Sequence, residues 1–113
     1  VDWRPREWNT SADYLAGLAI SQQKSGGTLT VGCITQALGE DMALQFYTDG
    51  GFNGEDGAFA VQLIGHKLED GERSRVMIGY FFEFVPRALS AFQMELLGLD
   101  RAIEMLWRAA AAH

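Results

Sequence analysis

The stretch that decides the fold covers residues 43–85 and reads ALQFYTDGGFNGEDGAFAVQLIGHKLEDGERSRVMIGYFFEFV. Within it, residues 43–49, 58–68 and 73–85 alternate their apolar side chains with a period of two, which is typical of β-strands. A glycine-rich segment separates the first two and an Asp-Gly pair separates the last two, as in hairpins. The pattern predicts an antiparallel meander in which the second strand is central and the third, apolar on both faces, is covered on both sides.

The segment after Pro86 has the periodicity of a long helix, which we expect over residues 88–110. Its large apolar side chains recur every three or four residues, so they share one stripe. We expect this helix to cover one face of the meander and to bury the stripe, which consists of Leu89, Phe92, Leu96, Leu99, Ile103 and Leu106. Together the two patterns predict an α/β fold in a single domain over residues 1–113.

The segment ahead of the meander contains a shorter helix and a linker. Three consecutive N-cap residues precede small apolar residues at helical spacing, so we expect a helix over residues 10–20. The linker, residues 22–41, begins with polar and glycine residues. Within it, residues 28–35 alternate in part and carry β-branched side chains, which favours a short strand.

Composition narrows the classes of function. Nine Lys and Arg residues against fifteen Asp and Glu residues give a net charge of −6, which argues against a protein that holds nucleic acid by charge alone. The longest uncharged run is too short and too polar to span a bilayer, and the start has no signal-peptide pattern. The single cysteine, Cys33, excludes an internal disulfide and favours a reducing intracellular compartment. We interpret Cys33 as a small apolar residue.

Three carboxylates are candidates for chemistry by their positions. Asp49 ends an apolar strand at a glycine-rich loop, where its oxygens can face a hard cation such as Mg²⁺. Glu95 has no Lys or Arg three or four residues away, so it is either at the boundary of the helix stripe or part of a site. Asp13 is either a helix-start residue, which the helix dipole favours, or a third member of that site.

Three segments together resemble ribonuclease H domains, including those of retroelement reverse transcriptases. Residues 46–51 (FYTDGG) resemble the first strand of that family, and residues 90–99 (SAFQMELLGL) resemble its first helix with a catalytic Glu. Residues 3–16 (WRPREWNTSADYLA) resemble the family's last segment, an arm followed by a helix with an Ala-Asp pair. The resemblance implies a ribonuclease H-like fold.

The order of these segments departs from the family. The segment that comes last in the family comes first here, and the middle of the domain, which holds a fourth strand with its own catalytic Asp, has no counterpart. The chain therefore resembles a permuted and truncated ribonuclease H domain. A histidine that the family often carries ahead of this last segment is also replaced, near Trp3.

The resemblance implies a two-metal site for hydrolysis of the RNA strand in RNA–DNA hybrids. Asp49 would bridge two Mg²⁺ (or Mn²⁺) ions, Glu95 would hold one of them, and Asp13 would hold the other. Because the fourth carboxylate is missing, two functions stay open. The chain is either a nuclease completed by a partner, or a non-catalytic remnant that serves as an interaction subunit of a larger assembly.

The strand at residues 43–49 raises a separate expectation about partners. In the family this strand is flanked by the missing fourth strand, so here it would be an exposed edge, which native proteins tend to cover. We expect either the chain's own residues 29–34 to pair with it as a strand, or a protein partner or second copy to cover it.

Overall fold

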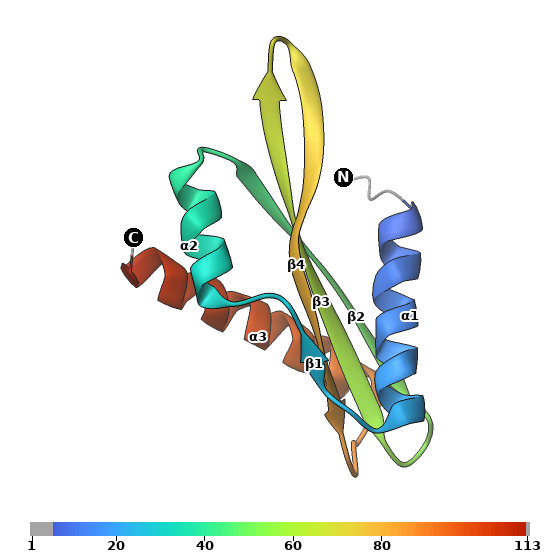
Figure 1. Cartoon of the computed structure of the whole chain (residues 1–113). Helices are drawn as coiled ribbons and strands as arrows, with labels where there is room; N and C mark the ends of the chain where they lie inside the picture. The colour runs from blue at the N-terminus through green and yellow to red at the C-terminus, as the bar shows by residue number, and fades with distance from the viewer. Residues whose placement is uncertain (1–5, 113) are drawn as a thin grey trace.

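The computed structural model describes residues 6–112 and, from residue 12 onward, their side chains. It is a mixed α/β fold of three helices and one four-stranded antiparallel sheet (Figure 1). The expected arm at residues 1–5 lies outside the described residues. The elements are, in chain order, α1 (Arg6–Gln22), β1 (Gly26–Gly27), α2 (Val31–Gly39), β2 (Ala43–Phe52), β3 (Gly57–Glu69), β4 (Glu72–Val85) and α3 (Ala91–Ala112).

The predicted meander is confirmed. The strands lie in the order β1-β4-β3-β2, all antiparallel, so β3 lies between β2 and β4. The turn between β3 and β4 is formed by Asp70 and Gly71, with φ values of 50° and 79°. Two adjacent residues with positive φ are what a type I′ hairpin turn requires, and this explains the Asp-Gly pair.

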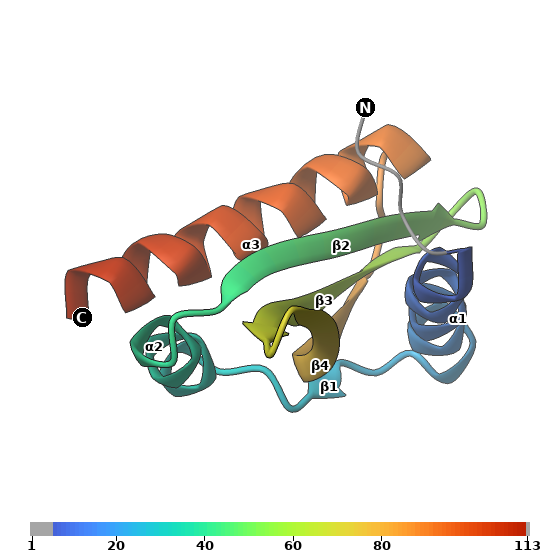
Figure 2. The same ribbon diagram turned by 90° about the horizontal axis from the view of Figure 1, so that it is seen from above.

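Helices cover both faces of the sheet (Figure 2). On one face α1 packs Ala16 and Ala19 against the small side chains of Ala58 and Ala60. On the other face α2 and α3 enclose the larger core, which includes Ile34, Phe59, Val61, Leu63 and Met94. The sheet therefore has a hydrophobic core on each face.

The expected strand at residues 28–35 is wrong, because this segment contains the start of α2. Thr30 is the N-cap, and its hydroxyl oxygen accepts a hydrogen bond from the backbone N–H of Cys33 at 3.2 Å. Ile34 and Ala37 are buried at helical spacing. The cap and this spacing outweigh the β propensity of the branched residues, which is a weak and context-dependent signal.

The edge of the sheet at β2 is consequently not covered by the chain's own residues 29–34. Among the described residues β2 pairs only with β3, and it ends the sheet. Only Gly26 and Gly27 of the linker join the sheet, and they pair with β4 at the opposite edge. The expectation of self-coverage by a strand is therefore wrong, because the linker becomes α2 on a face of the sheet.

The expected burial of the α3 stripe is also wrong. Its members are exposed, from 38% for Leu106 to 79% for Leu89. The helix instead faces the sheet with four other residues, namely Met94, Gly98, Ala102 and Ala109. The small residues let the helix approach the bulky side chains of the sheet closely. The face of α3 that fits the sheet by size is therefore the buried one.

The expected coverage of β4 on both sides holds only for its second half. Residues 72–77 are exposed, with Val76 and Met77 exposed by 50% and 46%. They belong to the end of the β3–β4 hairpin, which extends beyond the helices (Figure 1).

No helix in the described part of the chain is both long and apolar enough to cross a lipid bilayer.

Candidate functional site

Asp49 lies in the second half of β2, the edge strand. It is paired in register with Ala60 of β3, and its side chain is half-buried. Ala60 belongs to the core under α1. Since residues opposite each other in antiparallel strands share a face, the Asp49 carboxyl points to the α1 side of the sheet.

Asp13 approaches Asp49 from α1. This helix begins at Arg6, so Asp13 lies well inside it, and the interpretation of Asp13 as a helix-start residue is wrong. The neighbouring Ala12 and Ala16 are buried against the sheet, while the Asp13 residue is exposed beside them. The Asp13 and Asp49 carboxyls make a side-chain hydrogen bond.

Glu95 reaches the same end of β2 from α3, on the other face of the sheet. The first turns of α3 lie against Gly50: a Cβ placed there would be 2.7 Å from Met94 Cβ and 2.8 Å from the Glu95 nitrogen. Only a glycine fits such an approach. The residue after Asp49 thereby brings the backbone of Glu95 next to the strand, and the charge of Glu95 acts on Asp49.

Burial and two neighbouring carboxylates change the acidity of Asp49. Its pKa rises from 3.8 to about 6, chiefly because of burial, then because of the hydrogen bond and charge of Asp13, and least because of the charge of Glu95. The backbone N–H of Gly50 acts in the opposite direction. Asp49 therefore holds its proton more readily than an isolated carboxyl, as a half-buried carboxyl beside a like charge does.

This arrangement suits a divalent cation electrostatically. A bound cation would replace the proton on Asp49 and offset the repulsion that contributes to its raised pKa. In the described part of the chain no three acidic, His or Cys side chains already form a metal-ligating group. Asp13 and Asp49 share a hydrogen bond, whereas Glu95 acts on Asp49 through its charge.

No protein-family model, curated protein or solved structure gives a match to this chain.

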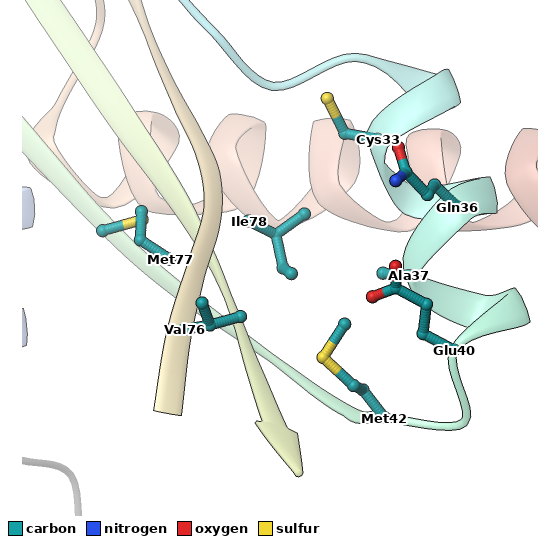
Figure 3. A pocket seen from close by; sticks show the side chains of 8 residues that line it. All are labelled: Cys33, Gln36, Ala37, Glu40, Met42, Val76, Met77 and Ile78. Carbon is teal, nitrogen blue, oxygen red and sulfur yellow. The ribbon is translucent and has the colours of Figure 1, made fainter. Parts of the chain in front are cut away.

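Cys33 has features that its interpretation as an apolar residue missed. The Thr30 hydroxyl donates to Cys33 Sγ at 3.2 Å, and this hydrogen bond is the first cause of a lowered thiol pKa. The signal in the sequence was a Thr three residues ahead of the Cys, at the start of an amphipathic segment. A hollow of about 240 Å³ lies between α2 and β4 (Figure 3), lined by Cys33, Gln36, Ala37, Glu40, Met42, Val76, Met77 and Ile78.

Proposed function

We propose that this chain is a ribonuclease H-like protein that binds Mg²⁺ or Mn²⁺ through Asp49, Asp13 and Glu95. With the missing strand and carboxylate supplied by a partner, it hydrolyses the RNA strand of RNA–DNA hybrids. In such sites one metal ion activates water and the other stabilises the leaving oxygen. Asp49 would be the shared ligand, with Glu95 and Asp13 each holding one ion.

The observation that carries this proposal is the juxtaposition of Asp13, Asp49 and Glu95. Asp13 of α1, 36 positions from Asp49, makes a hydrogen bond with it, and α3 brings Glu95, 46 positions away, close enough for its charge to act on Asp49. The sequence resemblance singled out the same three residues independently of the fold. A raised pKa that arises from burial and from like charges is also a feature that functional carboxylates share.

The need for a partner follows from coordination chemistry. Mg²⁺ requires near-octahedral oxygen ligands, and three carboxylates, one of them acting only through charge, are an incomplete set for two ions. The open edge of β2 is where an additional strand can be hydrogen-bonded to the sheet. Its end is next to Asp49, so a carboxylate carried on that strand would reach the site.

The experiment is a cleavage assay on end-labelled RNA–DNA hybrid, with the matching DNA duplex and single-stranded RNA as controls. Because the partner's carboxylate is absent from this assay, the proposal predicts only slow cleavage, of the RNA strand of the hybrid and not of the controls. This cleavage depends on Mn²⁺ or Mg²⁺ and is abolished by Asp49→Asn. Cleavage that persists in Asp49→Asn, or that proceeds equally without Mg²⁺ or Mn²⁺, contradicts the proposal. A matched variant, Asp70→Asn in the distant hairpin turn, should retain the wild-type rate.

A second candidate function is a non-catalytic interaction subunit. The observation that favours it is the amount of surface left unpartnered, namely the β2 edge and the apolar stripe of α3. If the chain binds Mn²⁺ but leaves every nucleic acid intact, with or without high metal concentrations, this second function is the better account.

A further inference from the structure

The exposed stripe of α3 has the spacing of a coiled-coil seam. Within the helix its members are four, three, four and three residues apart, which is the repeat of a and d positions over two heptads. We call these residues the α3 seam: Phe92, Leu96, Leu99, Ile103 and Leu106. They are 38–66% exposed. An apolar surface of this extent on a folded domain is typical of a protein–protein contact.

The α3 seam contains a hollow of the kind that receives a side chain from another helix. The hollow has a volume of about 400 Å³ and is lined by Gln93, Leu96, Leu97, Leu99, Asp100 and Ile103. Four of these residues stand at positions i, i+3, i+4 and i+7, namely Leu96, Leu99, Asp100 and Ile103. Four residues at this spacing form the hole into which a knob side chain of a facing helix packs.

Acidic side chains flank the α3 seam on both sides. Glu95 and Asp100 occupy the g and e positions, which face the partner in helix pairs. The arginines of α3 are already engaged: Arg101 is paired with Glu83 and Glu104, and Arg108 with Glu104. The flanks of the α3 seam therefore present uncompensated negative charge.

We propose that the α3 seam docks an amphipathic helix of another protein, with an apolar stripe flanked by Lys or Arg. The apolar stripe fills the hollow between Leu96 and Ile103, and a basic side chain meets Asp100. Glu95, which the proposed metal site also uses, is not needed for this contact.

Charge decides against other occupants of the α3 seam. In a parallel pair with a second copy, Glu95 would lie opposite Asp100. In an antiparallel pair, Glu95 would lie opposite Ala102 and Asp100 opposite Gln93, so neither acid would meet a basic side chain. Each copy also carries a net charge of −6. An anionic membrane surface is disfavoured by the same acidic flanks, since amphipathic helices that lie on membranes usually carry Lys and Arg there.

The test uses the full chain and two labelled helical peptides with Leu at every a and d position. One peptide carries Lys at every e and g position, and the other carries Glu. Fluorescence anisotropy should show that the Lys-flanked peptide binds at least about tenfold more tightly than the Glu-flanked peptide. Leu99→Glu should weaken its binding by about thirtyfold or more, because it buries a charge in the contact.

Two further variants separate a specific contact from bulk charge. Asp100→Lys should weaken binding of the Lys-flanked peptide by about two- to fivefold, the effect of one exposed ion pair. Glu72→Lys makes the same change of charge in the distant hairpin and should leave binding unchanged. Leu99 and Asp100 are exposed, so both variants should fold, and circular dichroism melts check that they do.

Four results would overturn the proposal. Equal binding of both peptides would show that the acidic flanks do not select a basic partner. Binding that Leu99→Glu does not weaken would show that the contact is not at the seam. A wild-type dimer in sedimentation equilibrium that Leu99→Glu dissociates would identify a second copy as the occupant. Binding to phosphatidylglycerol vesicles that Leu99→Glu abolishes would identify a membrane surface.

Discussion

The Asp49 carboxyl couples the site to pH. Its pKa in the folded chain is about 6, above the ordinary 3.8, so the folded state binds more protons than the unfolded state between about pH 4 and pH 6. The free energy of unfolding therefore falls as the pH rises through this window. The change is modest because Asp49 is only half-buried and solvent screens its charge.

Replacing Asp49 by Asn should remove this pH dependence. The amide resembles the protonated carboxyl, so the variant should match the wild type near pH 4 and be the more stable of the two above about pH 6. Urea unfolding at both ends of the window measures the difference. A variant that is less stable than the wild type above pH 6 would show that Asp49 is not repelled by its neighbours.

Gly50 and Gly98 form a matched pair for testing how closely α3 lies on the sheet. A methyl group at Gly50 would meet the Glu95 nitrogen at 2.8 Å, so Gly50→Ala should cost about 1–3 kcal/mol of stability. At Gly98 the nearest atoms, Phe59 Cβ and Thr48 Cβ, are at ordinary contact distances of 3.5 and 3.6 Å. Gly98→Ala should therefore stabilise α3 by up to about 1 kcal/mol.

Chemical denaturation of the two alanine variants checks this contrast. If Gly50→Ala were neutral, α3 would not be held against β2 at this point, and the placement of Glu95 near Asp49 would lose its support. Mg²⁺ should raise the melting temperature of Gly50→Ala less than that of Gly98→Ala. This difference would show that the packing of α3 on Gly50 supports metal binding.

Much of the candidate site could be predicted from sequence at the residue scale, but its electrostatics could not. The expected strand end at Asp49, and the resemblance of residues 46–51 to the first strand of ribonuclease H domains, indicated this residue, although β2 continues three residues further to Phe52. The raised pKa depends on burial and on two residues from other elements, which no local pattern encodes. The role of Gly50 as a contact point under α3 was hidden for the same reason.

At the scale of elements, the start of α2 carries its own test. Thr30 caps the helix and also lowers the pKa of the Cys33 thiol. Thr30→Ala should cost about 1 kcal/mol of stability. It should also return the thiol pKa toward 9.0, so that alkylation by iodoacetamide at neutral pH becomes slower.

Thr35→Ala is the control for this experiment. The Thr35 hydroxyl donates to the carbonyl of Val31 inside the same helix and does not touch the thiol. Its replacement should leave the alkylation rate of Cys33 unchanged. An equal loss of reactivity in both variants would mean that helix stability, and not the Thr30 hydrogen bond, controls the thiol.

The elements that sequence analysis predicted best are those with a long, regular pattern. The three strands of the meander alternate over many residues, so their order was predicted, and the bounds of β3 and β4 differ from the expected ones by at most one residue. The first strand, β2, runs three residues past its expected end, because Gly50 and Gly51 pair with β3 and do not end the strand. The segment 28–35 is short, and its β-branched residues led to the expectation of a strand. The N-cap at Thr30, which starts α2, was the stronger signal. For α3 the helix itself was predicted, but the buried face was not, because Gly and Ala on a helix give almost no hydrophobic signal.

At the scale of the whole molecule, the fold leaves surfaces that a stable domain usually covers. The molecule measures 49 × 31 × 25 Å, and its β3–β4 hairpin extends away from the helices (Figure 1). Among the described residues the β2 edge has no further strand beside it, and the α3 seam is exposed. Sequence patterns do not report which surfaces stay exposed, since the same apolar residues serve a core and a contact.

The central claim is that Asp13, Asp49 and Glu95 share a divalent cation. The most direct measurement is paramagnetic broadening by Mn²⁺ of the backbone amide signals in the folded chain. The account predicts that the amides of Asp13, Gly50 and Glu95 broaden together at the lowest Mn²⁺ concentrations, and that Asp49→Asn removes the effect. Broadening that is strongest at the acidic hairpin turn of Asp70, or that Asp49→Asn leaves unchanged, would contradict it.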